Sequence, residues 1–179
     1  MADLTLIAST PATGTLPVTR GTMTLSQADP GPLTSIAPYK GQAGAVSDAL
    51  QAATGLALPG VGTCATGKGA IQWFGRDLWL LSDMAAPDLP GAALTDQTDA
   101  WVTLDLTGPQ GAEVMARRVP MDLRLAAFPE GATARTEMHG MMVSVTRTGP
   151  DALRIMAFRS MAKTLAHAMI EAMENVAAL

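Results

Sequence analysis

The sequence predicts an α+β domain built from mixed or antiparallel β-sheets with covering helices. Several stretches alternate apolar and polar residues with the two-residue period of a β-strand, and short turns join many of them as in hairpins. Other segments repeat apolar residues at helical spacing, and helices and strands interleave along the chain. The two halves of the chain, roughly 21–83 and 97–179, resemble each other loosely in the order of their elements.

Residues 1–20 mix threonine, alanine and proline with one short apolar run, and we expect them to form an extended arm. Residues 21–179 are expected to form a single compact domain. Its first strands are predicted at 23–26 and 33–37, because the sequence Asp-Pro-Gly-Pro at 29–32 forces a turn between them.

The first helix is predicted over residues 42–54. Its apolar residues recur at helical spacing: Val46, Ala49, Leu50 and Ala53. Gly55 is suited to the left-handed residue that ends a helix. A hairpin is then predicted from strands at 70–74 and 78–81, and residues 84–96 are interpreted as a connection between the halves.

The second half begins with a predicted strand over residues 101–106. Gly108 and Pro109 lead into a predicted helix at 112–119, since proline is tolerated in a first helical turn, and Pro120 ends that helix. Alternation then predicts three strands, at 132–138, 141–147 and 152–158.

The final helix is the strongest prediction, and Ser160 is its expected N-cap. It carries a broad apolar face: Met161, Leu165, Ala168, Met169, Ala172, Met173 and Val176. A face of this size should pack against a sheet.

The composition excludes several classes of function. Charged residues make up 16% of the chain, against about 25% in typical soluble domains, and the net charge is −4. Nucleic-acid binding needs clustered Lys and Arg, and only Arg117 and Arg118 are adjacent. No stretch is long and apolar enough for a membrane span, and a single cysteine favours a reducing, cytoplasmic location.

Individual motifs give no convincing catalytic site. Residues 62–68 match the first seven positions of a phosphate-binding P-loop, but Gly69 stands where Ser or Thr would bind magnesium, so we interpret the segment as a flexible loop. Cys64 within it is interpreted as a bystander thiol. His139 and His167 have no metal-ligand spacing. The twelve methionines are assigned mainly to core packing, with some left to face a partner.

Three segments resemble the gamma subunit of heterotetrameric sarcosine oxidase: GRDLWLL at 75–81, residues 105–131, and FRSMAKTLAHAMIEAM at 158–173. The matching positions are expected to be structural or to lie in interfaces: Gly75, Asp77, Trp79, Asp105, Gly108, Pro109, Phe128, Pro129, Arg159 and Ser160. Asp77 is expected to satisfy turn backbone groups, and Asp105 to accept hydrogen bonds from the amides that begin the next helix.

The resemblance implies a fold similar to the folate-binding domain of the glycine-cleavage aminomethyltransferase. It also implies a noncatalytic role in a complex that oxidatively demethylates sarcosine to glycine and passes the one-carbon unit to tetrahydrofolate. The expected partners are the large alpha flavoprotein subunit and the beta and delta subunits. FAD, FMN, NAD and zinc are expected in those partners, so this chain should hold no cofactor. Isolated, it is expected to form a homodimer or to precipitate.

An alternative reading is a stand-alone module that binds folate or transfers an aminomethyl group. Such a module needs basic residues for the glutamyl tail of folate, and four arginines near predicted strands are available: Arg135, Arg147, Arg154 and Arg159. No spacing singles them out. The low charge of the chain is itself consistent with surface buried against a partner, because permanent interfaces are more apolar than free surfaces.

Overall fold

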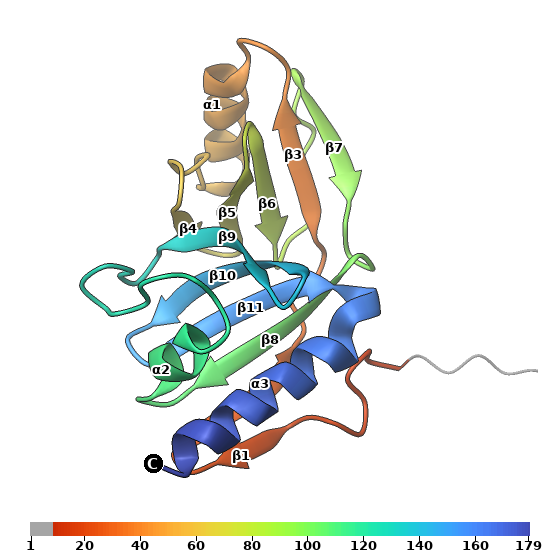
Figure 1. Cartoon of the computed structure of the whole chain (residues 1–179). Helices are drawn as coiled ribbons and strands as arrows, with labels where there is room; N and C mark the ends of the chain where they lie inside the picture. The colour runs from red at the N-terminus through yellow and green to blue at the C-terminus, as the bar shows by residue number, and fades with distance from the viewer. Residues whose placement is uncertain (1–8) are drawn as a thin grey trace, which may run out of the picture.

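The computed structural model describes residues 9–179, which form two antiparallel β-sheets with helices on their outer faces (Figure 1). This confirms the predicted α+β class. Every strand pairing in this part of the chain is antiparallel. The six-stranded sheet has the order β1 (Val18–Arg20), β2 (Met23–Ala28), β8 (Trp101–Thr107), β11 (Ala152–Phe158), β10 (Met141–Gly149) and β9 (Thr133–Met138).

The second sheet is five-stranded and lies above the first in Figure 1. Its order is β4 (Cys64–Thr66), β5 (Ala70–Gly75), β6 (Leu78–Ser82), β3 (Thr34–Pro38) and β7 (Ala92–Asp96). Helix α1 (Ala43–Thr54) covers its outer face, where Val46 and Leu50 are buried together with Ile36 and Ile71. The helix ends at Gly55, whose φ of 81° is left-handed as predicted.

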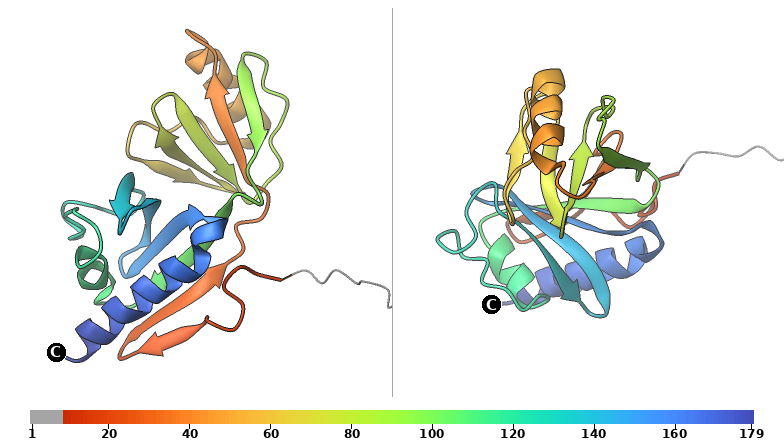
Figure 2. Two further views of the ribbon diagram at one scale, coloured as in Figure 1. Left: turned by 45° about the vertical axis from the view of Figure 1, so that its right-hand side comes forward. Right: turned by 90° about the horizontal axis from the view of Figure 1, so that it is seen from above.

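The largest core lies between the six-stranded sheet and two helices, α2 (Gly111–Ala116) and α3 (Ala162–Ala177). Helix α3 runs along the face that is turned away from the five-stranded sheet (Figure 2). Its buried residues are Ala162, Leu165, Ala166, Met169, Ala172, Met173 and Val176. The predicted docking of the final helix on a sheet is therefore confirmed, because most of the expected apolar face is buried.

The opposite face of the six-stranded sheet meets the five-stranded sheet through a partly polar interface. The Gln72 side chain of β5 donates from Nε2 to Ser144 Oγ at 3.2 Å and accepts at Oε1 from Thr146 Oγ1 at 3.2 Å. Beside this network lies a small apolar cluster: Leu33, Phe74, Leu80, Trp101 and Met156. The two sheets are thus joined by a few specific contacts rather than by a broad apolar layer.

Two strands correct the sequence-based interpretation. The segment predicted as a flexible loop at 62–68 contains β4, which pairs with β5, and the segment predicted as a connection at 84–96 contains β7, which pairs with β3. Both are edge strands, and four of the five residues of β7 are exposed. Edge strands of this kind form through backbone pairing, so their side chains carry little alternation.

Two helix ends also differ from expectation. Helix α2 stops at Ala116 instead of Val119, because Pro120 disfavours helical geometry before it and the chain tightens into bonds such as Arg118 N–H to Met115 O at 2.9 Å. Ser160 is not an N-cap. It lies in the 3₁₀ turn η1 (Arg159–Met161), without a side-chain capping bond, and α3 begins after it.

The N-terminal strands connect the two halves of the chain. Residues 1–8 of the expected arm lie outside the described residues, whereas Val18–Arg20 form β1 and pair with β2. Strand β2 in turn pairs with β8, so both strands extend the sheet of the second half. The division into an arm and a single domain over 21–179 stays a prediction. No helix within residues 9–179 is long and apolar enough to cross a membrane.

Candidate functional site

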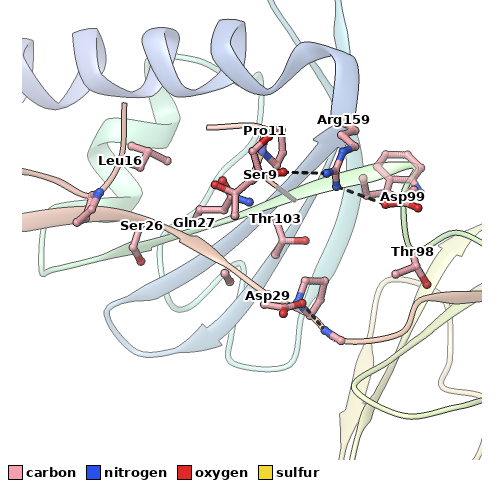
Figure 3. Close-up of a pocket in the computed structure, with 16 residues that line it drawn as sticks. Ser9, Pro11, Leu16, Ser26, Gln27, Asp29, Thr98, Asp99, Thr103 and Arg159 are labelled. Atoms are coloured by element: carbon pink, nitrogen blue, oxygen red, sulfur yellow. Dashed lines mark hydrogen bonds and ion pairs between the residues drawn. The ribbon is translucent and has the colours of Figure 1, made fainter. Parts of the chain in front are cut away.

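A cleft lies where the N-terminal segment passes β2, and we call it the β2 cleft (Figure 3). It has a volume of about 550 Å³. One side is formed by the segment around Ser9 and Pro17, and the other by Ser26–Ala28 of β2 and the turn that follows. Strand β1 pairs only with residues 23–25 of β2, which leaves this end of β2 open beside the cleft.

Arg159 lies at the rim of the β2 cleft, where β11 passes into the 3₁₀ turn (Figure 3). Its backbone N–H donates to Ala100 O at 2.8 Å, which fixes the residue. Its guanidinium is held only loosely, at 3.4 Å from Ser9 O and 3.7 Å from the Asp99 carboxylate. Ser160, its neighbour in the resemblance, is exposed.

Thr103 lies on β8 among the residues that line the cleft and is 1% exposed. Its hydroxyl has no hydrogen-bond partner within residues 9–179. Besides this hydroxyl the cleft presents the carboxylates Asp29 and Asp99, Gln27, and the apolar side of Trp101. Within the described part of the chain these residues form no nucleophile–base pair.

Asp105 and Arg154 form a bidentate ion pair on the same sheet. The Asp105 carboxylate accepts from Arg154 Nε at 2.8 Å and Nη2 at 2.9 Å, and each side chain is 27% exposed. This hydrogen bonding raises the pKa of Arg154. The expectation that Asp105 accepts from helix amides is wrong, because its strand position directs it at the cross-strand partner Arg154.

Gly108 and Pro109 form the bend after β8. Gly108 has a φ of 128°, and a Cβ there would lie 2.4 Å from Thr22 O, so only glycine fits. Its N–H donates to Asp151 O at 2.9 Å. Pro109 is exposed and precedes α2 by two residues. Both residues therefore have a structural role, because they shape the bend between β8 and α2.

The predicted hairpin motif lies far from the β2 cleft, in the five-stranded sheet. Gly75 sits at the irregular end of β5, and Asp77 occupies the turn with a φ of 52° and an exposed side chain. Trp79 donates from Nε1 to Pro59 O at 2.9 Å. With Tyr39, the Asp77 and Trp79 side chains line a small hollow of about 280 Å³.

Phe128 and Pro129 belong to a loop that lies beside β10. A buried arginine, Arg147, holds this loop, and the sequence did not predict that role for it. Arg147 is 2% exposed and donates to three backbone carbonyls, including Phe128 O at 2.6 Å and Pro150 O at 2.7 Å. Burial lowers the pKa of Arg147, and Asp151 opposes this shift. Phe128 is buried, whereas Pro129 is exposed and its carbonyl accepts from Ala132 N–H.

The four arginines suggested for folate are not brought together. Arg147 is enclosed by the loop, Arg154 is paired with Asp105, Arg159 lies at the β2 cleft, and Arg135 lies over the Phe74 ring. Because two are satisfied by internal partners on different faces of the sheet, the structure offers no shared basic pocket for a glutamyl tail.

The segment resembling a P-loop does not have P-loop geometry. Its central residues form β4, and the strand β5 follows instead of a helix. The Cys64 thiol is half-buried, and burial followed by the nearby Glu130 raises its pKa, so the thiolate is disfavoured. Within residues 9–179, no group of three or more metal-ligating side chains is placed to hold an ion.

The fold brings His139 and His167 to the same surface hollow, although their spacing in the sequence did not predict this. His139, at a tight turn with a φ of 49°, receives a hydrogen bond from Arg118 Nη1 at 3.1 Å, and Arg118 Nη2 donates to Glu171 at 2.9 Å. His167 and Lys163 complete a shallow surface hollow. The partner of Glu171 is thus Arg118 from another element, and no local spacing encodes that contact.

No protein-family model matches the chain. The chain is 32% identical over 144 residues to a curated protein named sarcosine oxidase subunit gamma from Corynebacterium sp. (strain U-96), covering 73% of this chain and 70% of that protein. It is also similar to a chain of the solved heterotetrameric sarcosine oxidase from Corynebacterium sp. U-96 in complex with pyrrole 2-carboxylate. That match has a TM-score of 0.82 and 26% identity, and covers 96% of this chain and 97% of the other.

Proposed function

This chain belongs to the family of sarcosine oxidase gamma subunits, and we propose that it acts as a subunit without catalytic residues of its own in a heterotetrameric sarcosine oxidase. The observation that carries the proposal is the match over nearly the whole chain to a chain of such an enzyme. The site geometry supports it, since resemblance residues such as Gly108 and Asp77 shape turns and strand ends.

The proposed complex oxidatively demethylates sarcosine to glycine, produces hydrogen peroxide and transfers the one-carbon unit to tetrahydrofolate. In this proposal the large alpha subunit is the direct neighbour of this chain, and beta and delta complete the assembly. FAD, FMN, NAD and zinc belong to those partners.

Co-expression tests the proposal. The chain is produced with an affinity tag, either alone or together with the cognate alpha, beta and delta subunits. We expect the chain produced alone to be colourless. We expect the co-expressed subunits to purify together as one flavoprotein with sarcosine oxidase activity. A chain that stays monomeric and never joins the other subunits contradicts the proposal. Titration of the isolated chain with tetrahydrofolate is the companion measurement, because saturable binding would favour a stand-alone folate module instead.

A further inference from the structure

Met142 differs from the other methionines of residues 9–179 in its exposure. It lies on β10 and is 46% exposed, whereas no other methionine in this range is more than partly exposed. Met84, Met121 and Met161 are half-buried. The remaining seven are buried: Met23, Met115, Met138, Met141, Met156, Met169 and Met173. The thioether side chain of Met142 is therefore the one that solvent reaches most easily in this part of the chain.

The strand geometry explains this exposure. Met141 and Val143 on either side of Met142 are buried in the core under α2 and α3, so the Met142 side chain points to the opposite face of the sheet. Met142 is directly paired with Glu137 on β9, which is the edge strand of the six-stranded sheet. The exposed Glu137 carboxylate accepts a hydrogen bond from the Gly140 N–H in the turn between the two strands. Met142 thus lies at a sheet edge, beside an exposed turn.

The Cys64 thiol is the competing sulfur within residues 9–179, and its setting makes it slow to oxidise. Peroxide attacks the thiolate form of cysteine, and burial together with Glu130 raises the pKa of Cys64, so little thiolate is present at neutral pH. The thioether of methionine carries no proton on sulfur, so its reaction needs no ionisation. An oxidant in solution should therefore react with Met142 before it reacts with Cys64.

We propose that Met142 is a modification site at which hydrogen peroxide, the oxidant produced by the complex, converts the thioether to a sulfoxide. The inference rests on the proposed function for the source of this oxidant. The sulfur lone pair attacks one peroxide oxygen, so that an S–O bond forms and the O–O bond breaks. The transferred oxygen gives its proton to the leaving oxygen, which departs as water. Sulfur is thereby oxidised by two electrons and the peroxide is reduced.

The fold tolerates the sulfoxide at position 142. A sulfoxide is polar, and at a buried position such as Met141 or Met169 it would place an unpaired acceptor in the core. At Met142 the new oxygen is hydrated instead. The neighbouring Glu137 carboxylate is also an acceptor, so the sulfoxide oxygen turns toward water and leaves the bond from Gly140 N–H to Glu137 in place. Modification of Met142 therefore changes the polarity of the surface without unfolding the sheet.

Peptide mapping of the full chain after treatment with dilute hydrogen peroxide tests the site itself. We expect sulfoxide to form at Met142 at least about fivefold faster than at Met84, Met121 or Met161. The melting temperature of the treated chain should stay within about 2 °C of the untreated chain, and treated Met142→Leu is the matched control for oxidation elsewhere. A rate at Met142 no higher than at the three half-buried methionines overturns the inference, and so does a larger shift that Met142→Leu abolishes.

Turnover of the assembled complex tests the source of the oxidant. The complex is supplied with sarcosine, with or without catalase, and Met142 sulfoxide is quantified by mass spectrometry. We expect the sulfoxide to accumulate with turnover, and catalase to lower its amount at least about fivefold. Turnover that leaves Met142 unoxidised overturns the inference. A complex that does not assemble, or that produces no peroxide, contradicts the proposed function instead, and the treatment of the full chain with added peroxide then decides the inference about Met142.

Discussion

The two faces of the six-stranded sheet show how one set of strands serves two purposes. The face under α2 and α3 is almost wholly apolar and buried, with Leu104, Ile155 and Val145 at 0% exposure. The opposite face carries the Asp105–Arg154 pair, the Gln72 network and the stacked rings of Trp101 and Phe158. The comparison indicates that the covered face contributes the larger share of apolar burial, while the polar face positions the second sheet.

The largest expected effect comes from a charge placed on the covered face. Met169→Asp puts a carboxylate at a position with 0% exposure, and we expect loss of soluble folding, because desolvating an unpaired charge costs at least about 4 kcal/mol here. The measurement is soluble yield and a thermal melt. Asn175→Asp, on the exposed side of α3, is the control and should melt like wild type. A normal cooperative melt for Met169→Asp would contradict the conclusion that the covered face contributes most to the stability of the protein.

Two arginines on opposite faces give a matched test. Arg147→Met leaves three backbone carbonyls without their donor, and we expect a loss of about 3 kcal/mol in the free energy of unfolding. Arg154→Met breaks a partly exposed ion pair, and we expect a loss of about 1 kcal/mol or less. Urea unfolding measures both. Equal losses in the free energy of unfolding for the two variants would contradict the proposed difference between the two faces of the sheet.

The contact between the sheets should respond more weakly. Gln72→Ala removes the side chain that bonds Ser144 and Thr146, and we expect a loss of about 1–2 kcal/mol. Calorimetry should still show one transition if residues 21–179 form a single domain. Two transitions in the wild-type chain would contradict the single-domain prediction and would make each sheet a folding unit of its own.

The smallest effect concerns Cys64, which lies on β4 at the edge of the second sheet. Its raised pKa means that the thiol stays protonated at neutral pH and that thiolate appears only as the pH rises toward that value. We therefore expect alkylation by iodoacetamide at pH 7.5 to be slower than for glutathione, without a change in stability. Labelling kinetics followed by mass spectrometry measure this rate, and labelling faster than glutathione would contradict the assignment.

Sequence patterns predicted those elements whose side chains are sorted between two environments. The strands β10 and β11 and the helix α3 were predicted because each has one buried apolar face and a second face of different character. The strands β4 and β7 were missed because backbone hydrogen bonds alone recruit them to a sheet edge.

The sites were less predictable than the fold. Of the motif residues, Arg159 lines the β2 cleft, while Asp77 and Trp79 line a separate hollow. Pairings such as Arg118 with Glu171 join residues 53 positions apart, and Arg135 acquires its setting from Phe74 on the other sheet. Local spacing contains no information about such contacts, because tertiary packing alone creates them.

The pairing of β2 with β8 has a consequence for the rate at which the protein folds. A hydrogen bond across this pair joins Thr107 to Thr24, 83 positions apart, so the central strand of the larger sheet must wait for a long loop to close. Loop closure of this length costs entropy before any contact compensates it, and such topologies fold slowly. During synthesis β1 and β2 can pair with each other, but β2 remains without its partner β8 until that strand has emerged. This leaves a period in which chaperones can capture the open edge of β2.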